Sequence, residues 1–215
     1  MSTKNKLPET LPVFPLSNFI IFPNTSVPLN IFEPRYLSMV TDCLKKDKIF
    51  GMIQPKVIKK NSNKPELYTV GCAGKIVNFE KTEDGRIILV LNGISRFKIL
   101  EEISTQKSYR ECKVNFEDFE LDRITKSNKI QFSDLNLIFK DLKKFFKKKN
   151  IILDWKELEK QNIDQVLNTL CMIAPFTLEE KQVLLETISL DDRKIKLKKI
   201  INTYTLSNME SKTLQ

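Results

Sequence analysis

Glycine is confined to one stretch of this chain. All five glycines lie between residues 51 and 93, and none follows in the rest of the 215 residues. Tight turns and strand bends use glycine because it adopts positive φ angles at no steric cost, whereas helix interiors avoid it. The distribution therefore predicts an α+β protein whose first half is rich in strands and whose second half is helical.

The hydrophobic pattern of the first half is typical of strands. Two apolar runs, Val70–Glu80 and Arg86–Asn92, flank the pair Asp84-Gly85, which is a strong hairpin signal. Apolar and polar residues alternate from Cys112 to Phe116, as in a half-buried strand. Shorter apolar runs predict further strands at Val13–Leu16, Ile20–Phe22, Val27–Phe32 and Ile49–Ile53. Prolines 12, 15, 23 and 28 predict that the first of these strands lie at sheet edges or bends.

One helix is expected to interrupt the strands, from Pro34 to about Lys45. Pro34 suits the first helical position, and apolar residues follow it at helical spacing. The turn that leads into this helix brings Glu33, Arg35 and Tyr36 together. Two interpretations remain open: these residues cap the helix and pair with each other, or they bind a ligand or partner at the mouth of the fold.

After about residue 122 the apolar spacing becomes helical. The first apolar stripe, with Ser133 as a candidate N-cap, consists of Leu135, Ile138, Leu142, Phe145 and Phe146. The second, which Pro175 ends, consists of Ile163, Val166, Leu167, Leu170 and Cys171. A capping box at Thr177–Glu180 begins another helix. The last stripe, which begins near two aspartates, consists of Leu197, Ile200, Ile201 and Tyr204.

The chain contains no histidine. This excludes Ser-His-Asp and Cys-His triads, histidine metal sites and imidazole pH switches. The four cysteines form no C-x-x-C pair, so zinc knuckles and thioredoxin-type sites are excluded as well, and such scattered thiols indicate a reducing compartment. Gly74-Lys75 does not complete a P-loop, because Thr69 stands where the motif requires glycine. We expect no catalytic residue, no metal site and no cofactor, and an enzyme that uses carboxylates, lysines, tyrosines or cysteines without a histidine partner is the alternative.

The formal net charge is +9, which invites a nucleic-acid or membrane-surface interpretation. Only six of the 36 basic residues are arginines, however, and arginine is the better residue for bidentate phosphate and base contacts. The lysine-rich segments 140–149 and 193–199 alternate with apolar core positions. Solvated helix faces are the favoured interpretation of these segments, and a basic face for RNA or anionic lipid is the alternative.

No targeting or membrane segment is visible. Residues 1–10 are polar and lack the apolar core of a secretory signal. The longest aliphatic runs, such as Ile87–Leu91, are far shorter than the roughly 20 residues that a membrane-spanning helix needs. We expect a cytoplasmic protein that does not insert into membranes.

An ordered series of motifs resembles the N-terminal domain of Lon proteases. The series is closest to the short stand-alone bacterial proteins of that family, which share the F-E-P-R-Y signature. It covers roughly residues 11–120 and consists of Leu11–Leu16 (LPVFPL), Phe22-Pro23, Pro28–Tyr36 (PLNIFEPRY), Val70–Ile76 (VGCAGKI), Asp84–Arg86 (DGR) and Asn92–Ile99 (NGISRFKI).

The resemblance implies a PUA-like β-barrel with one inserted helix, followed by a C-terminal helical bundle. On this basis we expect a polar tail at 1–10, the barrel at 11–122, the bundle at 123–206 and a second polar tail at 207–215. It also implies a non-catalytic module for substrate recognition, because ATP hydrolysis and peptide cleavage belong to later domains of Lon.

The expected partners are unfolded or degron-bearing protein segments, held in a groove near the 32–36 turn and the start of the 92–97 strand. The candidate partner-binding residues are Phe22, Glu33, Arg35, Tyr36, Asn92 and Arg96. PUA-like barrels also occur in RNA-binding proteins, so RNA is the alternative partner. A histidine-free hydrolase is a third, less favoured alternative.

Overall fold

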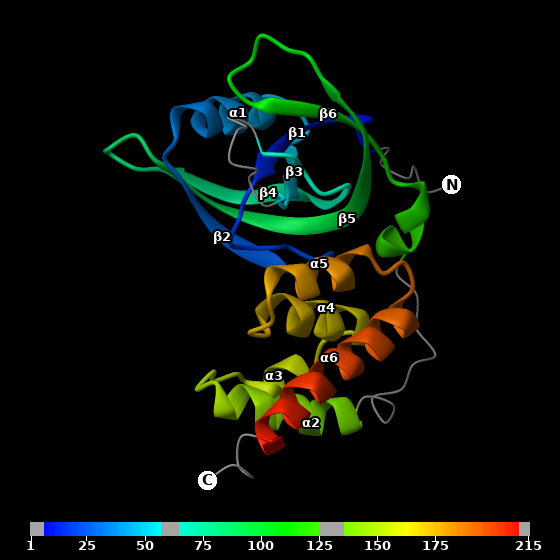
Figure 1. Ribbon diagram of the computed structural model, residues 1–215. Helices are drawn as coiled ribbons and strands as arrows, with labels where there is room; N and C mark the ends of the chain where they lie inside the picture. Colours follow the sequence, from blue (N-terminus) through cyan, green and yellow to red (C-terminus); the bar gives the residue numbers. More distant parts are fainter. Residues whose placement is uncertain (1–6, 57–64, 125–135, 211–215) are drawn as a thin grey trace. The chain divides into compact units, whose positions relative to one another are not determined.

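The computed structural model describes residues 7–56, 65–124 and 136–210 (Figure 1). The chain divides into two compact units, Met1–Ile124 and Thr125–Gln215. The elements of the first unit are β1 (Thr10–Pro15), β2 (Ser26–Ile31), α1 (Pro34–Leu44), β3 (Ile49–Ile53), β4 (Val70–Lys81), β5 (Ile87–Ile103), β6 (Arg110–Asn115) and the 3-10 helix η1 (Glu117–Arg123).

The strands of the first unit pair in a closed ring, in the order β5-β4-β3-β1-β6 and back to β5, and β2 adds to the outside of this ring along β5. The ring closes because β5 is 17 residues long. Its first part pairs with β2 and β4, whereas Lys98–Ile103 pairs with β6. All of these pairs are antiparallel except β1 with β3.

The core of this unit lies inside the ring, where alternate side chains of each strand meet. In β6, Cys112 and Val114 are buried and Lys113 is exposed, as the alternation predicts. These two residues belong to a cluster that also contains Leu11, Val13, Ile53, Ala73 and Phe97. All four cysteines are free and buried.

Helix α1 packs beside this core, as Figure 1 shows. The Tyr36 ring meets the edge of Phe14 from β1 at 4.4 Å between centroids. Tyr109, the residue before β6, donates a hydrogen bond of 2.9 Å from its hydroxyl to the Asp42 side chain of α1. The observed range of α1, Pro34–Leu44, agrees with the predicted range to within one residue.

One prediction for the early strands is wrong, and the sheet-edge alternative that the prolines suggested does not hold for β1. Ile20–Phe22 is not a strand but a buried irregular segment, ended by a turn in which the Thr25 hydroxyl donates to the Phe22 carbonyl at 2.7 Å. The first strand, β1, is not at a sheet edge, since it lies between β3 and β6. Its prolines are tolerated because the partner changes along the strand: Pro12 is opposite β6 only and Pro15 is opposite β3 only. Pro28 does lie in a strand, β2, that pairs on one side only.

The second unit is helical. Its elements are α2 (Asn136–Lys148), α3 (Trp155–Leu158), α4 (Ile163–Ile173), α5 (Leu178–Glu186) and α6 (Leu190–Glu210). The predicted capping box at Thr177 and Glu180 is present at the start of α5. Of the predicted stripes, Leu135 and Ser133 lie outside the described residues, and the residues that are buried as expected are Ile138, Leu142, Phe145, Phe146, Ile163, Val166, Leu167, Leu170, Cys171, Leu197 and Ile201.

Two features of the helical unit differ from the prediction. α6 continues to Glu210, into the segment 207–215 that was expected to be a polar tail. α3 was not predicted, because four residues are too few to display a helical period. Its start is nevertheless well defined, since the Asp154 side chain accepts a hydrogen bond from the Glu157 amide.

Candidate protein-binding surface

An apolar stripe crosses the outer face of the β2–β5 pair. Pro28 lies opposite Val90 and Asn30 lies opposite Ile88, so these four side chains share one face of the ladder. Phe32 is the residue that directly follows the end of β2 at Ile31. Phe32 is 64% exposed and Ile88 is 45% exposed. We call Pro28, Phe32, Ile88 and Val90 the outer patch.

The outer patch arises from the aliphatic run Ile87–Leu91. Alternate residues of a strand point to opposite faces, so Ile87, Leu89 and Leu91 are buried while Ile88 and Val90 point outwards. An antiparallel strand with one solvated face normally carries polar residues there. Sequence reasoning used this run to place a strand and to argue against a membrane span, although five consecutive aliphatic residues were already a signal that both faces of the strand are apolar.

The predicted turn lies at one end of the outer patch. Arg35 donates two hydrogen bonds to Glu33 Oε2, of 3.0 Å from Nε and 2.7 Å from Nη2, and its guanidinium lies 4.5 Å from the centre of the Tyr36 ring. Glu33 occupies the N-cap position but makes no side-chain capping bond. The ion pair is about half exposed, whereas Tyr36 is buried. Burial raises the pKa of the Tyr36 phenol, and the charge of Arg35 lowers it in part.

The other predicted site residues are divided between surface and core. Asn92 is half-buried and accepts a hydrogen bond of 3.4 Å from Ser26, at the end of the β2–β5 ladder opposite to the turn. The 32–36 turn and Asn92 therefore lie at opposite ends of the β2–β5 ladder, with Pro28, Ile88 and Val90 between them.

Phe22 and Arg96 are buried, with 0% and 2% exposure. Phe22 lies beneath the Asn92-Gly93 step, where the backbones approach so closely that a Cβ at Gly93 would come within 2.2 Å of the Phe22 carbonyl oxygen. Arg96 forms a salt bridge of 2.7 Å with Asp122 of η1 and lies 4.4 Å from the centre of the Phe119 ring. Their side chains support the fold and are closed to a docking partner.

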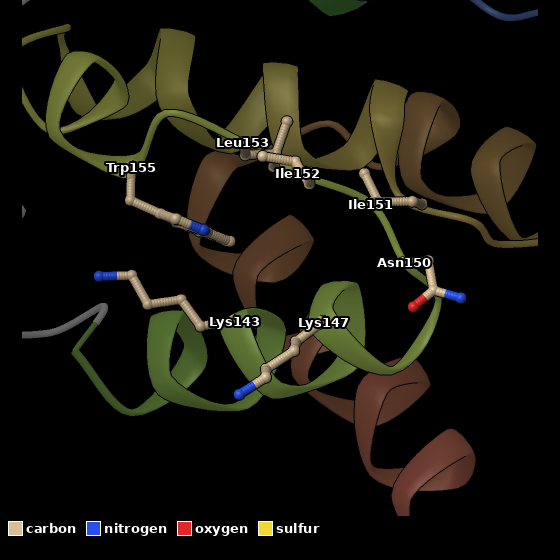
Figure 2. A pocket seen from close by; sticks show the side chains of 7 residues that line it. All are labelled: Lys143, Lys147, Asn150, Ile151, Ile152, Leu153 and Trp155. Carbon is tan, nitrogen blue, oxygen red and sulfur yellow. The ribbon is translucent and has the colours of Figure 1, made fainter.

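A pocket lies in the helical unit (Figure 2). It has a volume of about 330 Å³ and is lined by Lys143, Lys147, Asn150, Ile151, Ile152, Leu153 and Trp155. We call it the lysine–tryptophan pocket. The two lysines come from α2 along one side, and the loop before α3 forms the other side (Figure 2). The hydrophobic spacing of α2 had indicated only core and solvent faces, so sequence reasoning missed the pocket.

Two further observations concern the described part of the chain only. It holds no group of three or more cysteine, aspartate or glutamate side chains that is arranged to bind a metal ion. No helix in it combines the length and the apolar composition needed to cross a bilayer.

Residues 10–203 match the family model of the ATP-dependent protease La (LON) substrate-binding domain. Similar proteins include a Lon protease of Dictyoglomus thermophilum, 24% identical over 193 residues, which cover 87% of this chain and 23% of the relative. A Lon protease of Malacoplasma penetrans is 30% identical over 204 residues, 89% of this chain and 25% of the relative. The chain thus spans about a quarter of the length of these relatives.

Two solved structures share the fold. The Lon N-terminal domain protein from Xanthomonas campestris matches with a TM-score of 0.63 and 20% identity, over 90% of this chain and 97% of the other. The N-terminal domain of the Mycobacterium avium complex Lon protease matches with a TM-score of 0.60 and 14% identity, over 90% and 98%.

Proposed function

Because the chain belongs to the family of the Lon substrate-binding domain, we propose that it is a non-catalytic module that binds unfolded or degron-bearing protein segments at the outer patch. The apolar residues of the outer patch carry this proposal: Phe32 and Ile88 are exposed, and Val90 beside them is half-buried. Contiguous exposed apolar surface that is rimmed by polar residues is typical of protein interaction sites. Asn92 and the Glu33–Arg35 ion pair supply that rim at the two ends.

We also propose that the closed ring is a PUA-like barrel within residues 11–122 and that residues 123–206 form a separate bundle. The return of the strand pairing to β5 and the division of the chain after Ile124 support this. The four buried free cysteines suit work in a reducing compartment, and we place the protein in the cytoplasm.

Loss of the outer patch is expected to weaken binding without unfolding the protein. Burying a large apolar side chain contributes about 1.5–3 kcal/mol, so Phe32→Ser and Ile88→Ser should each weaken binding by at least about tenfold. The measurement is fluorescence anisotropy with labelled lysozyme that has been reduced and alkylated so that it stays unfolded. The matched control is Ile195→Ser, which changes an isoleucine of α6 that is 63% exposed, about as much as Phe32.

Two results would contradict the proposal. One is no binding of the unfolded probe by the unaltered protein at tens of micromolar. The other is an equal loss of affinity in Ile195→Ser, which would show that any exposed apolar residue contributes as much as the outer patch does.

Arg35 and Tyr36 are expected to respond differently to truncation. Arg35→Ala removes an exposed pair, so it should change the free energy of unfolding by less than about 1 kcal/mol. We expect it to weaken binding of the unfolded probe about tenfold, which is about 1.4 kcal/mol. Tyr36→Ala removes the buried ring against Phe14 and should cost about 2–4 kcal/mol of stability. Thermal unfolding and the anisotropy assay check both variants. An Arg35→Ala protein that melts several degrees lower but binds the unfolded probe normally would show that the turn supports the fold and does not bind the partner.

A further inference from the structure

The lysine–tryptophan pocket combines exposed apolar groups with exposed positive charge. Ile152 is 96% exposed, although it lies in the apolar tripeptide Ile151–Leu153. Trp155 beside it is half-buried, and its ring is held edge-on by Phe139 at 6.1 Å and Phe146 at 5.8 Å between centroids. Because these contacts fix the ring from one side, the pocket offers a rigid apolar wall to an incoming side chain.

The charged side of the pocket is formed by α2. Lys143 is already engaged, since its Nζ lies 3.1 Å from Glu159 Oε1 and 5.2 Å from the centre of the Trp155 ring. Lys147, one turn further on, is exposed and has no ion-pair partner within the described residues. Lys140 and Lys144 are exposed on the same side of the helix. Because the only acidic residue of α2 is Asp141, a positive stripe borders the apolar wall.

We propose that the lysine–tryptophan pocket binds an acidic peptide segment that carries an aliphatic side chain. The aliphatic group contacts Ile152 and Trp155, and flanking carboxylates pair with Lys147 and the neighbouring lysines of α2. Charge complementarity favours an acidic peptide, because several lysines in a row pair better with several carboxylates than with a single one. The proposal goes beyond the outer patch, which lies in the other unit and carries no comparable charge.

Peptide binding tests the proposal. The probe is a labelled peptide of about ten residues with two central leucines between glutamates. Lys147→Glu should weaken its binding at least tenfold, and Ile152→Ser should weaken it about tenfold. The matched control for charge is Lys198→Glu, which makes the same change at an exposed lysine of α6. It should alter binding less than twofold. All three positions are exposed, so the variants should keep the melting temperature of the unaltered protein.

Two altered peptides and a single-stranded RNA complete the experiment. A peptide with serines in place of the leucines, and one with lysines in place of the glutamates, should each bind at least tenfold more weakly. Phe32→Ser should leave binding of the acidic peptide unchanged, which separates this site from the outer patch. Equal binding of the serine peptide, or an equal loss in Lys198→Glu, would overturn the proposal. So would tighter binding of a single-stranded RNA of similar length that Lys147→Glu abolishes.

Discussion

Replacing Arg96 with methionine is expected to lower the free energy of unfolding of the β-rich unit by about 3–5 kcal/mol. Arg96 binds the Asp122 carboxylate through its Nε at 2.8 Å, its Nη2 at 2.7 Å and its backbone amide at 2.9 Å. The side chains of the pair are only 2% and 8% exposed. The variant leaves a carboxylate in a buried site without its guanidinium, which is the costly way to break such a pair.

A double-mutant cycle distinguishes the pair from the arginine alone. Because an apolar replacement of both partners removes the uncompensated charge, Arg96→Met with Asp122→Leu should recover a large part of the loss. Urea unfolding measures all four proteins. Arg86→Met, which breaks an exposed pair with Asp84, is the control and should leave the unfolding midpoint nearly unchanged. A midpoint for Arg96→Met as high as that of the control would show that the buried ion pair is not what holds η1 to β5.

Arg193 is expected to contribute as much to the stability of the helical unit as Arg96 does to that of the β-rich unit. It is 2% exposed and donates from Nε to the Leu184 carbonyl at 3.0 Å, from Nη2 to the Thr187 carbonyl at 3.1 Å and from Nη1 to the Asn168 side chain. It therefore ties α4 and the end of α5 to the first turn of α6. Each buried acceptor that loses its donor costs about 1–3 kcal/mol, and the costs are not additive, so Arg193→Met should destabilise the unit by roughly 3–5 kcal/mol.

Hydrogen exchange of the amides of α4 to α6 measures this effect within the helical unit. The control is Lys196→Met, which removes an exposed cation from α6, three residues after Arg193. Protection in the control should match that of the unaltered protein. If Arg193→Met retained full protection, the three hydrogen bonds would not be what joins these helices.

The parts of the fold that could be predicted from the sequence depend on local chemistry. The capping box at Thr177 and Glu180 satisfies amides within one helical turn, and the Asp84-Gly85 hairpin needs only the positive φ that Gly85 adopts. Helix α1 was likewise placed correctly, since Pro34 begins it and its apolar spacing lies within a few turns.

The parts that could not be predicted depend on residues far apart in the chain. Arg96 was expected to bind a partner, whereas its side chain is buried against Asp122, which lies 26 residues away in η1. The apolar segment Ile20–Phe22 is buried without pairing as a strand, and hydrophobicity alone does not separate these two states. The outer patch was missed because periodicity shows that Ile88 and Leu89 face opposite ways, not that the face of Ile88 stays uncovered.

The position of β1 between β3 and β6 has a consequence for the order of folding. Thr10–Val13 pairs with Arg110–Lys113, so β1 acquires this neighbour only after about a hundred more residues have been synthesised. Closing so long a loop is slow, and domains rich in distant strand pairs typically fold in milliseconds to seconds. Until β6 has been synthesised, β1 exposes one unpaired edge. During synthesis, the nascent chain is therefore an incompletely folded protein in which the edge of β1 that later pairs with β6 is still unpaired.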